Sequence, residues 1–314
     1  MQQWAPLVEY RRENIAEVVK FGAVMCVSGD QILYQLGDDI VCFGRSLLKP
    51  YQMKVFTQAL DAVLSSEQKA LSLASHNAEL AHTDIVHTML NDGLERFLKT
   101  PDSLPLMPNK DNHQASPWNH PCSGKHAGVL RGCQEKGWPL EGYQSLTHPY
   151  HTAFTNALKT ELGSDWEASA VGFDGCGLPA HSFTLFEITK LFAALAKNKH
   201  DDWIWESMTR HPELIGGTGR LDTKIMQACA GKVLAKEGAD GLLGLAISHP
   251  EHPQGLGIVI KLSHGWDASA TGFVAEAILQ KMGFNVPPTE QPGGQVAVVN
   301  TDITSSEAFP LPKA

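Results

Sequence analysis

The hydrophobic residues of this chain follow two kinds of pattern, which occupy different stretches. Short runs rich in β-branched and aromatic residues lie at residues 24–27, 32–35 and 40–43, separated by glycine and aspartate turns. Such runs predict an antiparallel meander. Strand-like runs return at residues 241–247 and 257–261. The pattern therefore predicts strands at both ends of the chain.

Hydrophobic residues at helical spacing fill most of the region between these strands. Helices are predicted over residues 46–63, 80–100, 127–133, much of 150–235, and 268–281. Five prolines fall within residues 101–121 and predict a long irregular segment there. Long irregular segments in compact proteins are often functional.

Together these elements predict an α+β fold. The N- and C-terminal strands are expected to form one antiparallel sheet packed with helices, with a mainly helical region inserted between them. We expect a single unit over residues 1–314, with its helical portion at about 46–235 and its sheet portion at about 20–45 and 236–285.

The composition agrees with a globular protein and excludes some partners. Of the 314 residues, 43% are hydrophobic and the formal net charge is −9, which argues against a nucleic acid or an anionic membrane as partner. The longest apolar stretches, Phe21–Val27 and Leu242–Ile247, are too short to span a bilayer. The N-terminal residues lack the pattern of a secretory signal. We therefore expect a cytoplasmic protein.

A Ser-x-x-Lys motif at Ser46 and Lys49 is the first candidate for chemistry. Residues three apart share one face of a helix. Burial lowers the pKa of a lysine, and a neutral amine can take the proton of a nearby serine hydroxyl. The motif is common by chance, and a second copy at Ser66 and Lys69 lies in a polar stretch typical of a solvated helix end.

Two later motifs add context to this pair. Active serines in penicillin-recognising enzymes are accompanied by Ser-x-Asn and Lys-[Thr/Ser]-Gly. Here Ser75-His76-Asn77 and Lys236-Glu237-Gly238 follow in the same order, the latter leading into a predicted strand. The alternatives are a helix N-cap for Ser75 and an ordinary surface lysine for Lys236.

The six cysteines include no Cys-x-x-Cys pair, and we expect them to be reduced. Cys122 and Cys176 differ from the others because both lie beside glycines in turn-like segments. Two thiolates from separate turns can bind zinc. The usual spacing of a closed zinc site is absent, so a metal site with other ligands and no metal at all both stay open.

Six motifs in order resemble the rhizobial-type (class 3) L-asparaginases of the asparaginase II family, over about residues 20–265. The motifs are Arg45-Ser46-Leu47-Leu48-Lys49-Pro50, Ser75-His76-Asn77-Ala78-Glu79, Cys122-Ser123-Gly124-Lys125-His126-Ala127-Gly128, Asp174-Gly175-Cys176-Gly177-Leu178-Pro179, Gly217-Thr218-Gly219-Arg220-Leu221-Asp222-Thr223 and Lys236-Glu237-Gly238-Ala239-Asp240-Gly241.

The resemblance implies a fold like that of the serine β-lactamases and glutaminases. It also implies hydrolysis of L-asparagine to L-aspartate and ammonia by a homodimer. Two serine–lysine pairs are implied, Ser46 with Lys49 and Ser75 with Lys236. In this hypothesis Ser46 attacks the side-chain amide, Lys49 accepts its proton, and the second pair relays a proton to ammonia.

The resemblance further implies a zinc ion held by Cys122, Lys125 and Cys176, with water completing its shell. Asp222 is a departure, because some members carry a cysteine at this position near the metal.

Substrate-binding roles are assigned to Arg45, His126 and Asp174, since an amino acid substrate needs an acid and a base nearby. The competing functions are a glutaminase, a β-lactamase or an esterase on the same scaffold, or a non-catalytic zinc-binding or ligand-binding module.

Overall fold

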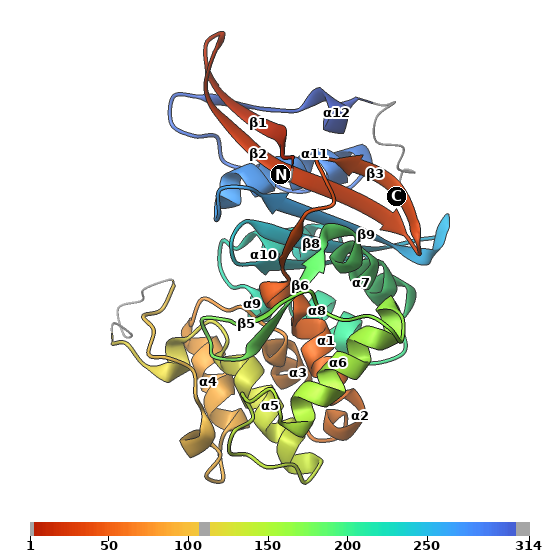
Figure 1. Ribbon diagram of the computed structural model, residues 1–314. Helices are drawn as coiled ribbons and strands as arrows, with labels where there is room; N and C mark the ends of the chain where they lie inside the picture. Colours follow the sequence, from red (N-terminus) through yellow and green to blue (C-terminus); the bar gives the residue numbers. More distant parts are fainter. Residues whose placement is uncertain (1–2, 107–113, 306–314) are drawn as a thin grey trace. The chain divides into compact units, whose positions relative to one another are not determined.

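A computed structural model describes residues 3–106 and 114–305 (Figure 1). Pro108, one of the prolines of the predicted irregular segment, lies outside the described residues. The chain forms two compact units. The first comprises residues 1–42, 183–198 and 224–314, and the second comprises residues 43–182 and 199–223. Helices and mainly antiparallel strands confirm the predicted α+β class.

The first unit holds an antiparallel sheet made from both ends of the chain, as predicted. Its strands run in the order β10-β1-β2-β9-β8-β7, and β3 pairs with β2. Their bounds are β1 (Ala5–Arg12), β2 (Ile15–Ser28), β3 (Gln31–Leu36), β7 (Val233–Gly238), β8 (Leu242–His249), β9 (His252–Leu262) and β10 (Val296–Val299). The centre of the sheet pairs β2 with β9, where Met25 lies opposite Val259.

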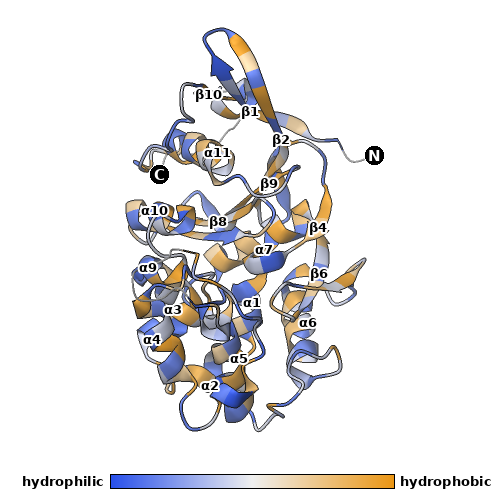
Figure 2. Ribbon diagram, turned by 90° about the vertical axis from the view of Figure 1, so that its left-hand side faces the viewer, coloured by the Kyte–Doolittle hydropathy of each residue, from blue (hydrophilic) through white to orange (hydrophobic). Residues whose placement is uncertain are grey.

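Helix α7 (Leu185–Lys197) packs against β8 and β9 of this sheet. Gly257 permits the close approach, because a Cβ there would lie 2.1 Å from the Thr189 carbonyl oxygen of α7. Thr184 and Glu187 form a capping box at the start of the helix. Figure 2 shows the mixture of hydrophobic and hydrophilic residues along α7 that an amphipathic helix requires. The unit also contains α11 (Ala268–Lys281) and α12 (Thr301–Thr304).

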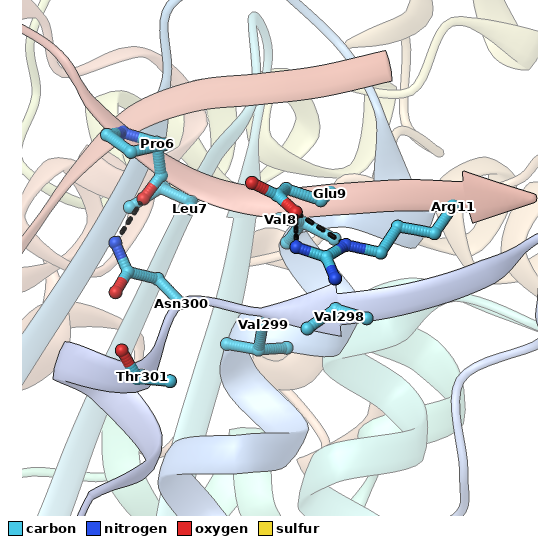
Figure 3. Close-up of a pocket in the computed structure, with 9 residues that line it drawn as sticks. All are labelled: Pro6, Leu7, Val8, Glu9, Arg11, Val298, Val299, Asn300 and Thr301. Carbon is cyan, nitrogen blue, oxygen red and sulfur yellow. Dashed lines mark hydrogen bonds and ion pairs between the residues drawn. The ribbon is translucent and has the colours of Figure 1, made fainter. Parts of the chain in front are cut away.

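A pocket of about 230 Å³ lies where β1 meets β10 (Figure 3). Asn300 Nδ2 donates a hydrogen bond of 2.6 Å to the Pro6 carbonyl oxygen at one end. At the other end, Arg11 and Glu9 form an ion pair. Both partners of that pair are partly exposed, so it contributes little to stability.

The second unit is mainly helical. Its elements are β4 (Val41–Phe43), η1 (Arg45–Leu48), α1 (Lys49–Lys54), α2 (Thr57–Leu60), α3 (Ser66–Ser72), α4 (Leu80–Met89), η2 (Glu95–Phe97), η3 (Pro117–Asn119), α5 (Ser123–Glu135), α6 (Pro149–Leu162), β5 (Val171–Phe173), β6 (Pro179–Thr184), α8 (Ile204–Arg210) and α9 (Pro212–Ile215). Strands β4, β6 and β5 form a small sheet in that order, and β4 and β6 each cross the boundary between the units. Helix α10 (Leu221–Ala228) also crosses it.

Three glycines four residues apart give α5 a bare face inside this unit. A Cβ on Gly124 would lie 2.4 Å from the Leu71 carbonyl oxygen. A Cβ on Gly128 would lie 2.6 Å from Ser72 Cβ, and one on Gly132 would lie 2.3 Å from the Phe56 ring. These contacts require glycine and let α5 pack closely against its neighbours. They therefore fix how deeply the first turn of α5, which carries Lys125 and His126, is buried in the unit.

Several predicted boundaries were wrong. The helix expected over residues 46–63 is divided into η1, α1 and α2, because the chain turns at Phe56, whose buried ring stacks on Tyr150 at 5.4 Å. The helix expected to reach residue 100 ends at Met89. The third strand of the expected meander, β4, pairs with β6 instead of β3, and β1 was not predicted.

Candidate active site

A buried lysine lies beside the second serine motif. Lys49 begins α1 and is 1% exposed. Its Nζ atom donates hydrogen bonds to the Ala74 carbonyl oxygen and, at 2.8 Å, to Ser75 Oγ. Ser46 lies one turn earlier in η1 and is half-buried. Lys49 therefore has a direct contact with Ser75, the serine of the second motif.

The residue before Ser46 adopts an unusual backbone conformation. Arg45 has φ +48°, in the left-handed region that favours glycine. Its guanidinium forms an ion pair with the Asp174 carboxylate, and both side chains are largely shielded from solvent. Strained residues of this kind cluster at functional sites and persist only where the surroundings hold them. Two predicted substrate-binding residues therefore lie together, at the start of the predicted nucleophile's helix.

The predicted metal ligands also converge. Lys125, on α5 and 1% exposed, donates a hydrogen bond of 3.1 Å to Cys176 Sγ. A hydrogen bond from Cys176, reinforced by the charges of Lys49 and Lys125, holds the pKa of Cys122 well below its ordinary value despite burial. The same hydrogen bond, together with burial, raises the pKa of Cys176. Burial opposes the charged form of Lys125, but the two sulfurs outweigh it and raise its pKa.

These sulfur and nitrogen donors suit zinc. Zinc prefers thiolate and nitrogen ligands in a tetrahedral shell, and a site with three protein ligands leaves a fourth position for water or substrate. Over residues 3–106 and 114–305, no three His, Cys, Asp or Glu side chains gather as a metal site. A zinc ion here would therefore need Lys125 as its third ligand.

His126, the third predicted substrate-binding residue, follows Lys125 on α5 and is fully buried. Its Nδ1 atom lies 2.6 Å from the Tyr143 hydroxyl, which accepts the Lys99 N–H. Burial lowers the pKa of His126 and keeps the ring neutral. Among the described residues no hydrogen-bond partner faces the buried Nε2 atom.

Two other lysines of the sequence motifs occupy different settings. Lys236 is buried on β7 of the first unit, where its Nζ donates a hydrogen bond of 2.7 Å to the Glu237 carbonyl oxygen. Its pairing with Ser75 stays a prediction. Lys69, from the second Ser-x-x-Lys motif, instead lies 2.7 Å from Asp61 Oδ1.

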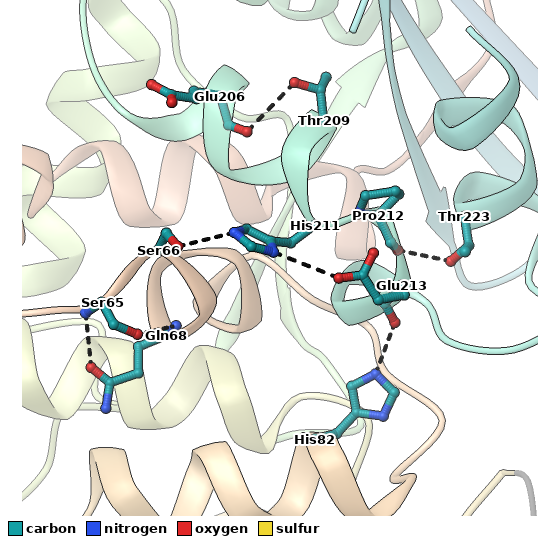
Figure 4. Close-up of polar contacts among 10 residues, drawn as sticks. All are labelled: Ser65, Ser66, Gln68, His82, Glu206, Thr209, His211, Pro212, Glu213 and Thr223. Atoms are coloured by element: carbon teal, nitrogen blue, oxygen red, sulfur yellow. Dashed lines mark hydrogen bonds and ion pairs between the residues drawn. The ribbon is translucent and has the colours of Figure 1, made fainter. Parts of the chain in front are cut away.

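The segment that follows α8 adds residues to which the sequence motifs assigned no catalytic role. Ser66 Oγ lies 3.0 Å from His211 Nε2, and His82 Nε2 lies 3.1 Å from the Glu213 carbonyl oxygen (Figure 4). Farther along, Arg220 donates to the Ser75 carbonyl oxygen. Asp222 is buried, and its Oδ1 accepts the Thr223 N–H at 2.9 Å. The Gly-Thr-Gly sequence before Arg220 was the available signal for this contact.

The chain belongs to the L-asparaginase II family, whose model matches residues 8–306. Membership makes the protein an asparaginase-type amidohydrolase that acts on a small molecule. No curated protein shows a significant match to the chain. In the part of the chain that the structure describes, no helix combines the length and hydrophobicity needed to cross a membrane.

Proposed function

We propose that this protein hydrolyses L-asparagine to L-aspartate and ammonia through an acyl-enzyme on Ser46. The observation that carries the proposal is the buried contact between Lys49 Nζ and Ser75 Oγ, one turn from Ser46. An activated serine needs a neighbouring base, and we assign that role to this buried amine.

In the proposed reaction, Ser46 Oγ attacks the side-chain amide carbon while neutral Lys49 takes the hydroxyl proton. The tetrahedral intermediate collapses when the carbon–nitrogen bond breaks, and ammonia leaves with a proton supplied through Lys49 and Ser75. Water then attacks the ester, which releases aspartate and returns the proton to Ser46. Lys236, assigned by family resemblance, would assist Ser75. The Ser46 N–H is the candidate donor to the oxyanion.

Arg45 and Asp174 have the charges that the α-carboxylate and α-ammonium groups of asparagine require. The Arg45 guanidinium matches a carboxylate in shape as well as in charge. Their mutual ion pair orients both side chains before substrate arrives. The buried Nε2 atom of His126 is a further polar group for binding the substrate.

Zinc is proposed as the resident metal, held by Cys122, Lys125 and Cys176. Binding would require both cysteines as thiolates and Lys125 as a neutral amine, so it would release protons. A bound zinc ion would supply a Lewis acid for a substrate oxygen. The same family resemblance makes a homodimer the expected assembly.

The test is ammonia release by purified protein from L-asparagine and L-glutamine, with nitrocefin and a p-nitrophenyl ester measured in parallel. We expect asparagine to be the preferred substrate and Ser46→Ala to abolish turnover. The second Ser-x-x-Lys motif provides the matched control, since Ser66→Ala should retain full activity. Preference for glutamine, nitrocefin or the ester would assign one of the rival hydrolases. No turnover of any of them would favour a non-catalytic module.

A further inference from the structure

The segment that carries Ser75 is held by contacts with a distant stretch of the same unit. Residues 75–79 belong to neither a helix nor a strand. The Ser75 N–H donates to the Ile215 carbonyl oxygen at 2.8 Å, and the Asn77 N–H donates to that of Gly216 at 2.9 Å. Ala78 has φ +61°, a conformation that needs support from its surroundings. The position of Ser75 Oγ therefore depends on residues 215–220.

Arg220 joins two points of this segment through a single nitrogen. Its Nη1 atom donates to the Ser75 carbonyl oxygen at 3.2 Å and to Asn77 Oδ1 at 3.3 Å. Asn77 Nδ2 in turn donates to the Thr218 carbonyl oxygen at 3.0 Å. The guanidinium thus fixes the backbone of Ser75 and the side chain two residues later. Hydrogen bonds from a charged donor are stronger than neutral ones.

The Glu79 carboxylate holds the other end of residues 75–79 through hydrogen bonds from Thr218. Its Oε1 accepts the Thr218 N–H at 2.7 Å, and its Oε2 accepts the Thr218 hydroxyl at 3.2 Å. Burial opposes the ionised form, but these hydrogen bonds and that from Asn77 together lower the pKa of Glu79. The carboxylate is thus ionised at neutral pH, and residues 75–79 are held at both ends.

Gly217 allows residues 215–220 to approach residues 75–79 closely. It has φ +109°, and a Cβ there would lie 2.6 Å from Glu79 Oε1 and 2.8 Å from Asn77 Nδ2. Gly219 also has a positive φ, +79°, but a Cβ there would meet nothing within 4 Å. Both glycines are conformationally required, while only Gly217 transmits a change in volume to the Ser75 segment.

We infer that Arg220 is a positioning residue for Ser75, holding its Oγ atom within hydrogen-bond reach of Lys49 Nζ. The inference rests on the proposed function, in which Ser75 moves a proton during the chemical step. Loss of the guanidinium should therefore reduce kcat and leave KM nearly unchanged, because Arg220 Nη1 bonds to the Ser75 segment, whereas the proposed substrate-binding residues Arg45 and Asp174 hold each other in an ion pair.

The experiment compares Arg220→Met and Arg220→Lys with wild type. We expect Arg220→Met to lower kcat about 10-fold to 100-fold, as for loss of a hydrogen bond from a charged group. KM should stay within about threefold of the wild-type value. Arg220→Lys retains a cationic donor and should recover most of the lost rate. Arg210→Met is the matched control, because Arg210 is exposed and pairs only weakly with Glu206 at 3.4 Å.

A second pair of variants tests the same geometry without removing a charge. Gly217→Ala and Gly219→Ala both force a Cβ into a left-handed conformation, so both should lower the apparent Tm. Only Gly217→Ala should also lower kcat, since only its Cβ displaces Asn77 and Glu79. Equal kcat values for the two alanine variants, measured where both are folded, would overturn the inference.

A crystal structure of Arg220→Met separates this inference from the proposed function. We expect Ser75 Oγ to move out of hydrogen-bond reach of Lys49 Nζ, a contact of 2.8 Å here. An unchanged contact, or an unchanged kcat in an enzyme that hydrolyses asparagine, would refute the positioning role. If wild type does not hydrolyse asparagine but Ser75 still moves in the variant, the proposed function fails and the structural role of Arg220 stands.

Discussion

Replacement of Lys49 by methionine separates the chemical role of this residue from its structural one. Methionine has a similar length and volume but neither a charge nor a hydrogen-bond donor. The change removes the hydrogen bonds to the Ala74 carbonyl oxygen and to Ser75 Oγ, which for the neutral amine that a base requires contribute about 0.5–1.5 kcal/mol each. It also removes the cost of burying a polar amine, which is about 1–3 kcal/mol. The two effects oppose each other, so the free energy of unfolding should change by less than about 2 kcal/mol.

The effect on catalysis should be much larger. General base catalysis contributes about 10²-fold to 10⁴-fold, so Lys49→Met should lower kcat about 1,000-fold, or about 4 kcal/mol of transition-state stabilisation. The assay is ammonia release under saturating asparagine, with the apparent Tm measured on the same samples. Lys69→Met, from the second Ser-x-x-Lys motif, is the control and should retain its rate. Activity of Lys49→Met within tenfold of wild type, with the fold intact, would refute the assignment of Lys49 as the base.

Three further predictions concern the serines, the metal and pH. Ser46→Ala should remove the acyl-enzyme entirely, while Ser75→Ala should leave slow acylation, which mass spectrometry after rapid acid quench can detect as a mass increase on the protein. Cys122→Ser should lower the zinc content measured by elemental analysis, whereas an equal zinc content in the variant and wild type would exclude this cysteine as a ligand. Burial, together with the charge of a neighbouring histidine, lowers the pKa of His181 to about 4 from 6.5. The pKa of His181 is lower in the folded state than in the unfolded state. The contribution of the neutral, buried ring to the free energy of unfolding is therefore complete above about pH 6.5 and is lost as the pH falls towards 4. The apparent Tm should therefore fall between about pH 6.5 and 4, and it should fall less steeply in His181→Phe than in wild type. An equal change of apparent Tm with pH in the two proteins would contradict this role of His181.

The sequence predicted elements best where one local pattern decided the outcome. Helix α11 has the predicted bounds, and α5 ends within two residues of its predicted end but begins four residues earlier, at Ser123. The helix after Ser46 was harder, because the turn at Phe56 comes from packing against Tyr150, about ninety residues later. No local propensity encodes that contact. Strand β1 was missed because it carries four charged or polar side chains among its eight residues and alternates only weakly.

In the candidate site, too, local motifs predicted which residues matter, but tertiary packing determined their contacts. Motif order brought Ser46, Lys49 and Ser75 to notice, and the structure places Lys49 against Ser75. Spacing along a helix indicates which Cα atoms are near one another, but not which acceptor a four-carbon side chain will take. Helical i, i+3 spacing therefore could not predict the contact of Lys49 with Ser75. The ion pair between Arg45 and Asp174 spans 129 residues, and only the tertiary fold determines it.

The strand order of the first unit has a consequence for biosynthesis. Strand β2 pairs with β9, whose residues leave the ribosome more than 200 positions later. At about 5–20 residues per second, the apolar half of β2 waits at least ten seconds for its partner. During that interval an unsatisfied strand edge is available to other nascent chains. Newly made protein should therefore depend on chaperones until translation nears its end, and expression at lower temperature should improve the yield of folded enzyme.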